Sequence, residues 1–397
     1  MTDEQRARLA RILSGLPAAA KELLATTDWG SLRHAYGPGT DIPATLCALV
    51  DEQPQVRAEA LGMLDAAVLH QGSLYTVTAP AALFAAAILD HPAGLAEHEG
   101  YFPWDEGPPR TLRADLLAWL GLVAESASYG EDPVRDRLDW QWEPWHEETA
   151  RESTPDERAA LHACRGIRPA LADAVEPFLS SPDPHVREAA LGAAVPLLSA
   201  PELADRIPRV AALLRSRSNG AQTRRERAGL ARALGVWRAD TSDLLADPDP
   251  AVRVCAALGP APTDRPRALA VLLDALRSPR ATDGWFRQPL PGIAGWFRFT
   301  VLRAALFLAE SFEEIAPVAL AIVTSGGTSM ADHERGPILF RAFPGGYDPA
   351  RSLTPAQHAL LRAFVATDAS THGIAGNSAW FRAAGLPEHR DGITALL

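Results

Sequence analysis

Three copies of the tripeptide Trp-Phe-Arg are the residues of this sequence best suited to bind a ligand. Tryptophan gives a large rigid contact surface, and arginine can stack on an aromatic ring or bind a carboxylate, sulfate or phosphate group. The first copy is expected in a loop and the second at the start of a helix over residues 296–310. The alternative is that the second copy is ordinary core with an arginine in a structural role. The copies are Trp285-Phe286-Arg287, Trp296-Phe297-Arg298 and Trp380-Phe381-Arg382.

Four polar aromatic residues near the N-terminus form a second candidate group, namely His34, Tyr36, His70 and Tyr75. They lie in two glycine-containing segments that join predicted helices. One interpretation is that their hydrogen bonds fix the angle between neighbouring helix pairs. The other is that they line a binding pocket, because binding residues are frequent on loops held by a rigid scaffold.

Long connecting segments hold the remaining candidates. Trp104 is central in an acidic, Pro- and Gly-rich loop over residues 91–110, and ordered loops of that length are often functional. His333 and Arg341 lie near another long loop. Arg341 could form an anion site with Arg287, Arg298 and Arg303, and His333 or Tyr36 could supply a general acid or base. The neighbours of His333 are Asp and Glu, but three consecutive side chains point in different directions and cannot bind one metal ion.

No stronger catalytic or metal-binding pattern is present. The sequence has no paired-cysteine zinc spacing, no His-Glu-x-x-His, no Gly-x-Ser-x-Gly and no dinucleotide-binding fingerprint, so neither a cofactor nor a metal is expected. Cys47, Cys164 and Cys255 are far apart in Ala- and Leu-rich surroundings, which indicates buried thiols in a reducing compartment. The charged N-terminus and the lack of a long apolar run favour a cytoplasmic protein without a membrane span.

A recurring turn-and-helix motif indicates which elements position these residues. Aspartate caps helix N-termini and proline suits the first helical turn, so each copy predicts a helix start. Small alanines after the turn allow neighbouring helices to approach closely. A single helix pair cannot bury its apolar face, whereas stacked pairs can. The copies are Ser181-Pro182-Asp183-Pro184-His185-Val186-Arg187, Asp247-Pro248-Asp249-Pro250-Ala251-Val252-Arg253 and the looser Glu52-Gln53-Pro54-Gln55-Val56-Arg57.

These copies resemble the HEAT and phycobilisome-lyase-type helical repeats. The resemblance implies that the turn aspartate and the helix arginine bond between adjacent repeats, which gives Arg57, Arg187 and Arg253 a structural role. In addition, the segment His34-Ala35-Tyr36-Gly37 and the segment His70-Gln71-Gly72 are similar to the opening of a group of uncharacterised bacterial HEAT-repeat proteins. This second similarity covers residues 28–90 and implies the fold but no chemistry.

The sequence therefore predicts an all-α protein, a right-handed α-solenoid of HEAT-like helical hairpins with long loop insertions. Strand-type alternation is scarce, and 33 prolines and 29 glycines fit many short turns between helices. One solenoid is expected over residues 1–397, with N-terminal repeats at 1–127 and C-terminal repeats at 156–397. An acidic, Trp-rich connection at 128–155 joins them.

The net charge of −11 disfavours a general nucleic-acid binder. The charge is unevenly placed, with ten acids and three arginines in residues 131–157, and eight arginines and one acid in residues 206–232. Such runs are either solvated surfaces or a bipolar surface that orients a charged partner.

Fold and composition together favour a protein–protein interaction scaffold that binds another protein on the concave face of the solenoid. An alternative is a small-molecule-binding protein, or a lyase- or cyclase-type enzyme, that holds an anionic substrate in an arginine and aromatic pocket on that face. A minor alternative is a helical-repeat DNA-binding or DNA glycosylase-like protein. The first predicts a broad open surface, the second a closed pocket, and the third a continuous positive groove.

Overall fold

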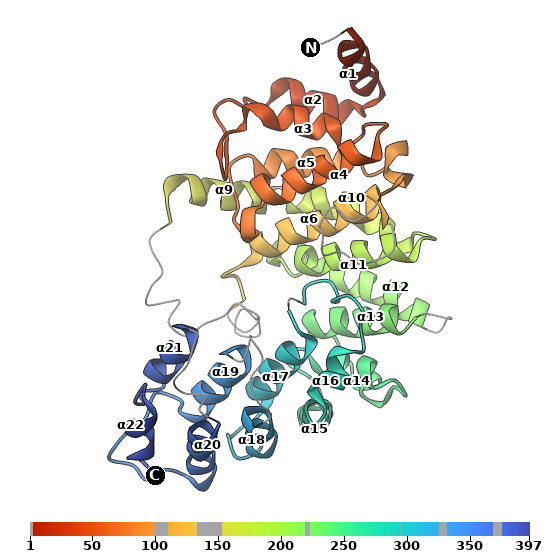
Figure 1. Ribbon diagram of the computed structural model, residues 1–397. Coiled ribbons are helices and arrows are strands. Elements are labelled where there is room, and N and C mark those ends of the chain that lie inside the picture. The colour runs from red at the N-terminus through yellow and green to blue at the C-terminus, as the bar shows by residue number, and fades with distance from the viewer. Residues whose placement is uncertain are drawn as a thin grey trace. The chain divides into compact units, whose positions relative to one another are not determined.

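A computed structural model describes residues 3–98, 110–132, 153–218, 223–293, 295–324, 332–367 and 375–397 of the chain (Figure 1). Over these residues the protein is mostly helical, as predicted, and its strands form short antiparallel hairpins. β1 (Arg33–His34) pairs with β2 (Gly37–Pro38), and β3 (Glu97–His98) pairs with β4 (Arg110–Thr111). None of the helices in these ranges combines the length and the apolar character that a membrane-spanning segment needs.

Two compact units make up the fold. The first contains Met1–Asp132 and Glu152–Ala221, and the described part of the second lies within Gln222–Leu397. The helices of the first unit are α1 (Asp3–Gly15), α2 (Ala18–Thr26), α3 (Ile42–Ala48), α4 (Pro54–Met63), α5 (Thr78–Ala87), α6 (Leu112–Ser128), α9 (Pro155–Gly166), α10 (Arg168–Val175), α11 (Pro184–Leu198) and α12 (Ile207–Ser218). The helices of the second unit are α13 (Arg224–Val236), α14 (Pro250–Ala257), α15 (Arg265–Leu276), α16 (Pro279–Asp283), α17 (Phe297–Leu308), α18 (Ala316–Thr324), α19 (Asp332–Ala342), α20 (Pro355–Ala366), α21 (Ala375–Ala383) and α22 (Arg390–Thr394).

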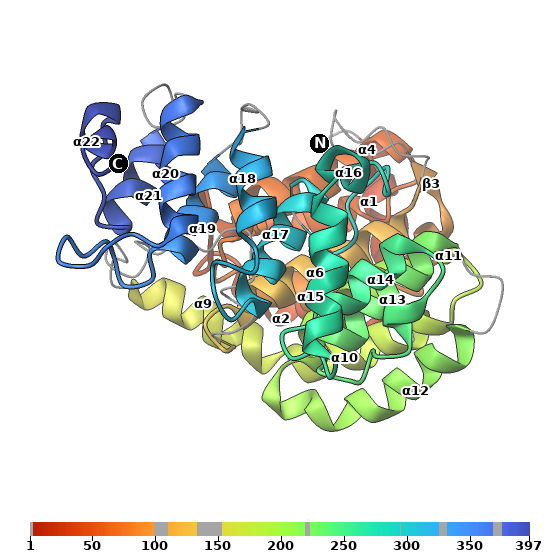
Figure 2. The ribbon, with the colours of Figure 1, turned by 90° about the horizontal axis from the view of Figure 1, so that it is seen from below.

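Within each unit, the helices pack in rows. In the second unit α17, α19 and α21 follow one another in one row, and α18, α20 and α22 follow one another in a second row (Figure 1, Figure 2). α18 also contacts α19, which joins the two rows. In the first unit α2, α5, α6 and α11 pack one on the next in the same manner.

The motif copies begin helices as predicted, because α4, α11 and α14 each start at the proline of a copy. The Asp183 carboxylate accepts a hydrogen bond from the His185 N–H at 2.8 Å, and the Asp249 carboxylate accepts one from the Ala251 N–H at 3.0 Å. Each aspartate thereby satisfies an N–H group that has no partner inside the first helical turn.

The arginine of each copy folds back onto its own turn. Nη1 of Arg57, Arg187 and Arg253 each donates to two carbonyl oxygens of the preceding turn, at distances between 2.7 and 3.1 Å. These arginines are structural, as predicted. For Arg57 and Arg253 one expectation from the resemblance is corrected, since the carbonyl oxygens that accept from Nη1 lie in the arginine's own turn and not in a neighbouring one.

The turn carboxylates, in contrast, do reach a neighbouring helix. Asp249 binds Arg224 of α13 at 2.8 Å, and Asp51 binds Arg8 of α1. Burial alone would raise the pKa of the Asp249 carboxyl, but hydrogen bonds from Arg224 and from the Ala251 N–H hold the pKa below its ordinary value. Asp249 thus joins the turn before α14 to α13, and Asp51 joins the turn before α4 to α1.

Small residues set the spacing between the main helices of the first unit. A Cβ atom placed on Gly121 of α6 would lie 3.1 Å from the Ala193 Cα atom of α11. Ala193 itself is fully buried. The two backbones are therefore in direct contact, as the run of alanines after Arg187 predicts.

Candidate functional site

The three Trp-Phe-Arg copies lie in three different environments. In the first, Trp285 is half-buried in the loop after α16 and Arg287 is exposed. In the second, Trp296 precedes α17 and is 51% exposed, whereas Arg298 is 6% exposed. In the third, the Trp380 ring is 3% exposed inside the core, next to the Phe340 ring at 6.4 Å. Only the first two copies can therefore offer a surface to a partner.

Arg298 is bound by two carboxylates. Its Nε donates to Glu334 Oε1 at 2.7 Å, its Nη1 binds Asp283, and its backbone N–H donates to Asp283 Oδ1 at 3.0 Å. The guanidinium also lies 5.0 Å from the Trp296 ring and 4.9 Å from the Phe299 ring. Burial opposes its charge, but the hydrogen bonds that it donates to Glu334 and Asp283 outweigh burial and raise the pKa of Arg298. Arg298 thus fixes the start of α17 to α16 and α19.

Arg341 and His333 have contacts of a structural kind. Nε of Arg341 donates to the Leu306 carbonyl at 3.0 Å and Nη2 to the Ala309 carbonyl at 2.8 Å, so the side chain closes the C-terminal end of α17. The His333 ring lies 5.5 Å from the Phe299 ring, in a tilted contact. Trp104 lies outside the described residues.

Three of the four N-terminal candidates come together at one corner of the first unit. The Tyr36 hydroxyl is 3.3 Å from His70 Nδ1, and His34 Nε2 is 3.2 Å from the Asp41 carboxylate. His34 Nδ1 accepts the Tyr36 N–H at 3.2 Å, which leaves the proton on Nε2 for Asp41. Tyr36 is nevertheless 67% exposed. The Tyr36–His70 contact joins the turn between β1 and β2 to the turn at His70. Tyr75 is half-buried, and its backbone N–H donates to the Thr78 hydroxyl at 2.9 Å.

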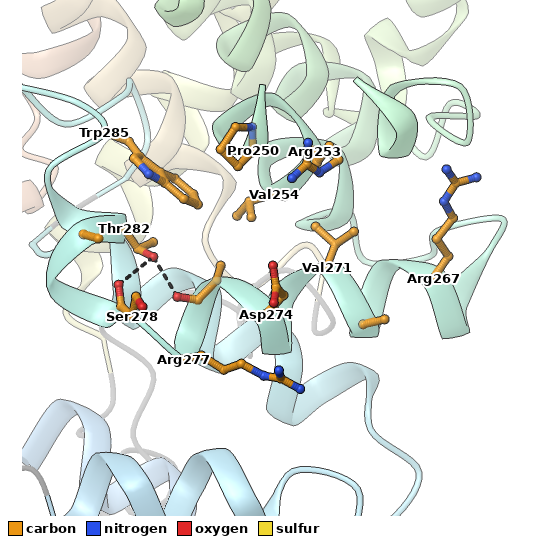
Figure 3. Close-up of a pocket in the computed structure, with 13 residues that line it drawn as sticks. Pro250, Arg253, Val254, Arg267, Val271, Asp274, Arg277, Ser278, Thr282 and Trp285 are labelled. Atoms are coloured by element: carbon orange, nitrogen blue, oxygen red, sulfur yellow. Dashed lines mark hydrogen bonds between the residues drawn. The ribbon is translucent and has the colours of Figure 1, made fainter. Parts of the chain in front are cut away.

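An open hollow of about 580 Å³ lies against Trp285, between α14, α15 and α16, and is called here the Trp285 hollow. Figure 3 shows the Trp285 ring beside Pro250 and Val254, with Arg267 and Arg277 extending outward at the edge. Val254 is buried and forms part of an apolar floor. The lining residues are Pro250, Arg253, Val254, Arg267, Ala270, Val271, Asp274, Ala275, Arg277, Ser278, Ala281, Thr282 and Trp285.

One face of α15 supplies most of this lining, because residues three or four apart share a face of a helix. The face runs from Arg267 through Ala270, Val271 and Asp274 to Arg277. The opposite face of α15 is buried in the core. The Arg267, Asp274 and Arg277 positions were not among the candidates from the sequence, and their regular spacing is the signal that could have identified them.

A second, smaller hollow of about 200 Å³ adjoins Trp296 and is called the Trp296 hollow. Its walls include the Phe286, Leu290 and Ile293 side chains, and Arg287 lies at its edge. The two hollows are neighbours, since Trp285 lines one and Phe286 the other. Both rings pack on Phe297, with centroids at 6.2 Å for Trp285 and 5.2 Å for Phe286.

The loop that lines part of the Trp296 hollow is held in place by arginines of α13. Arg225 donates to the Gln288 and Pro289 carbonyl oxygens, the latter at 2.7 Å, and Arg232 donates to the Gly292 carbonyl at 2.6 Å. These arginines belong to the basic run at 206–232. Much of that run is therefore used in internal contacts of this kind.

The exposed arginines around the hollows differ from their neighbours. The guanidinium groups of Arg267, Arg277 and Arg287 make no hydrogen bond or ion pair with any described residue. Nor does the Trp285 indole N–H bond any described residue. Several other described arginines of the second unit have carboxylate partners in the same unit: Arg224 and Arg227 bind Asp249, Arg265 binds Glu310, Arg298 binds Asp283, and Arg382 binds Glu388.

The thiols and acidic groups of the described residues show no second chemical centre. Burial raises the pKa of the Cys164 thiol and of the Cys255 thiol to about 12 in each case. Burial also raises the pKa of Cys47. Among the described residues, no three His, Cys, Asp or Glu side chains are grouped closely enough to hold a metal ion.

The arrangement can bind an apolar side chain beside Trp285, with guanidinium groups free at the edge to pair with carboxylates. In comparisons with known proteins, no family model matches the sequence, no curated protein matches it, and no solved structure matches it.

Proposed function

We propose that this chain is a HEAT-like helical-repeat scaffold for protein–protein interaction, and that its second unit binds a segment of a partner protein in the Trp285 hollow. The position of Trp285 carries the proposal. Its ring is half-buried at the wall of an open apolar hollow, and its indole N–H has no hydrogen-bond partner among the described residues. Tryptophan and arginine are the residues most enriched where binding energy concentrates in protein interfaces.

The repeat assignment is supported by the recurrence of one local geometry in both units. The turn before α4, the turn before α11 and the turn before α14 are each closed by the arginine that follows the valine of the motif. The row of α17, α19 and α21 and the row of α18, α20 and α22 add the layered contacts of stacked helix pairs. A solenoid built in this way offers long, regular surfaces, which is why such folds often serve as scaffolds.

The form of the Trp285 hollow favours a partner protein over a small molecule. Small-molecule sites usually enclose most of their ligand. Here the exposed side chains of α15 leave the hollow open along the helix, with an apolar floor and a charged edge. An apolar centre within a polar rim is the usual organisation of a protein interface.

The test is to fill the hollow without touching the core. Ala270 is exposed on α15 and lines the hollow, so Ala270→Trp blocks it, while Ala321→Trp places the same ring on the exposed face of α18. A photoreactive amino acid at Ser278, in the full chain expressed in its own host, identifies the polypeptide that contacts the hollow. The purified partner should then bind Ala321→Trp as tightly as the unaltered protein and bind Ala270→Trp at least about tenfold more weakly. Equal binding by the two variants would exclude the Trp285 hollow as the site.

A further inference from the structure

If the proposed function is correct, the charges around the two hollows indicate which charge the partner segment carries. Arg267 and Arg277 stand at the edge of the Trp285 hollow, and Arg287 stands at the edge of the Trp296 hollow. All three side chains are exposed, and none has a hydrogen-bond or ion-pair partner among the described residues. The chain as a whole has a net charge of −11, so a local excess of positive charge is not a consequence of composition.

The carboxylates at the same surface do not cancel this charge. Asp283 lines the Trp296 hollow but is bound by Arg298. Asp274 is the one acidic residue that lines the Trp285 hollow, whereas three arginines line it, namely Arg253, Arg267 and Arg277. The surface therefore attracts negative charge, and Asp274 weakens that attraction.

The two hollows are close enough to bind one segment. Trp285 and Phe286 are consecutive, face different hollows, and both pack on Phe297. The loop that lines part of the Trp296 hollow is held by Arg225 and Arg232 of α13, so this part of the surface exists before a partner arrives. A preformed surface binds more tightly, because less conformational freedom is lost on binding.

We infer that the partner segment is an acidic peptide with two apolar side chains, one for each hollow, and with carboxylates that pair with Arg277 and Arg287. The first apolar side chain packs on the Trp285 ring, above the floor made by Val254 and Val271. The second enters the Trp296 hollow between Phe286 and Ile293. The Trp285 indole N–H donates to a carbonyl or carboxylate oxygen of the segment.

The experiment selects peptides without assuming a partner. A display library of random sixteen-residue peptides is selected on the full chain at low salt, and the enriched peptides are synthesised and titrated by fluorescence anisotropy. The expected peptides carry several Asp or Glu residues around two apolar ones. Arg277→Glu and Arg287→Glu should each weaken their binding by about tenfold, and so should an increase of salt to about 0.5 M.

Two further variants separate a charge effect from damage to the fold. Arg362→Glu reverses an exposed arginine of α20 that has no partner among the described residues, and it should leave peptide binding unchanged. Asp274→Asn removes the opposing carboxylate and should strengthen binding by about threefold, which a destabilised surface would not do.

The outcomes distinguish the inference from the function on which it rests. For enriched peptides that bind Ala270→Trp more weakly, two results overturn the acidic-peptide inference: a neutral or basic composition, or binding to Arg277→Glu as tight as to the unaltered protein. In either case the scaffold proposal stands. If no peptide is enriched, or if Ala270→Trp has no effect, both fail. Tighter binding of a single-stranded oligonucleotide than of any acidic peptide would also overturn the inference.

Discussion

At the scale of single residues, the three Trp-Phe-Arg copies have the same composition but different roles, because the backbone around each differs. Trp285 stands in a loop and borders a hollow, Arg298 is enclosed by Asp283 and Glu334, and Trp380 is part of the core. Arginine pairs well with planar carboxylates when both are buried. A buried charge of this kind is costly when its partner is lost.

Removal of the Arg298 side chain should strongly destabilise the second unit. In Arg298→Ala, the Asp283 and Glu334 carboxylates stay largely buried without a cation, and the expected loss is about 3 kcal/mol in the free energy of unfolding. Urea denaturation followed by circular dichroism measures it. Arg362→Ala, in which an exposed arginine without a described partner is removed, should change it by less than about 0.5 kcal/mol. Similar losses in both variants would contradict the role given to Arg298.

The three thiols should be inert in the folded protein. Cys47, Cys164 and Cys255 are buried, and the pKa of Cys164 and of Cys255 is about 12, so almost no thiolate exists at pH 8. A chromogenic disulfide reagent should react with all three cysteines in denaturant and with none in buffer within minutes. Rapid reaction of the native protein would show that the reagent reaches a cysteine, which would contradict the burial of all three thiols.

At the scale of helices and turns, the sequence predicted most of the helix starts in the motif regions. The reason is local, since Asp and Pro act within one turn of the helix they begin. The pairing of Arg298 with Asp283 and Glu334 could not be predicted, because these residues come from three different helices. Only one residue of the Trp285 hollow was a candidate from the sequence. Trp285 itself was a candidate, whereas the lining face of α15 carries ordinary solvent-facing residues until α14 and α16 pack beside it.

The turn carboxylate Asp249 should make part of the free energy of unfolding depend on pH. Arg224 and the Ala251 N–H hold the pKa of Asp249 below its ordinary value. Its contribution is therefore present above the unfolded pKa of about 4 and is lost as the pH falls through the lower, folded pKa. Asp249→Asn should reduce the free energy of unfolding at pH 7 by about 1 kcal/mol, and the difference should vanish near pH 2.

Asp274→Asn is the matched control for this pH profile, because the Asp274 carboxylate is exposed and binds no described residue. Its unfolding free energy at pH 7 should stay within about 0.5 kcal/mol of that of the unaltered protein. A profile of Asp249→Asn that runs parallel to the unaltered protein down to pH 2 would contradict the role of the Asp249 charge.

The contact between α19 and α21 should not tolerate an added methyl group. A Cβ atom on Gly336 would lie 2.2 Å from the Trp380 ring, so Gly336→Ala must displace that ring. The expected cost is about 2 kcal/mol, although alanine favours helices over glycine. Gly166→Ala at the end of α9, where no atom lies within 4 Å, should be neutral or slightly stabilising. Thermal unfolding of both variants tests this, and an unchanged melting temperature for Gly336→Ala would show that Trp380 can move freely.

At the scale of the whole molecule, the residues that line both hollows belong to the second unit. Peptide binding should therefore be insensitive to changes on the surface of the first unit. Tyr36→Ala and Leu95→Ala alter the two most exposed large apolar side chains described there, and both should bind the selected peptides with unchanged affinity. Loss of binding in either variant would place part of the site in the first unit.

The arginine that closes each turn on itself has a consequence for how such a chain can change length. Because Arg57 and Arg253 use acceptors five and six residues before them, each turn-and-helix module carries its own closure. A duplicated module would keep the hydrogen bonds between its arginine and its own turn. Deletion of a module would remove both the arginine and its acceptors, so no arginine of a neighbouring module would lose its partners. Only the aspartate that reaches back to the previous helix would have to find a new cation. Insertion of a whole module therefore breaks few hydrogen bonds at these turns. An insertion or deletion inside a module separates the arginine from its acceptors.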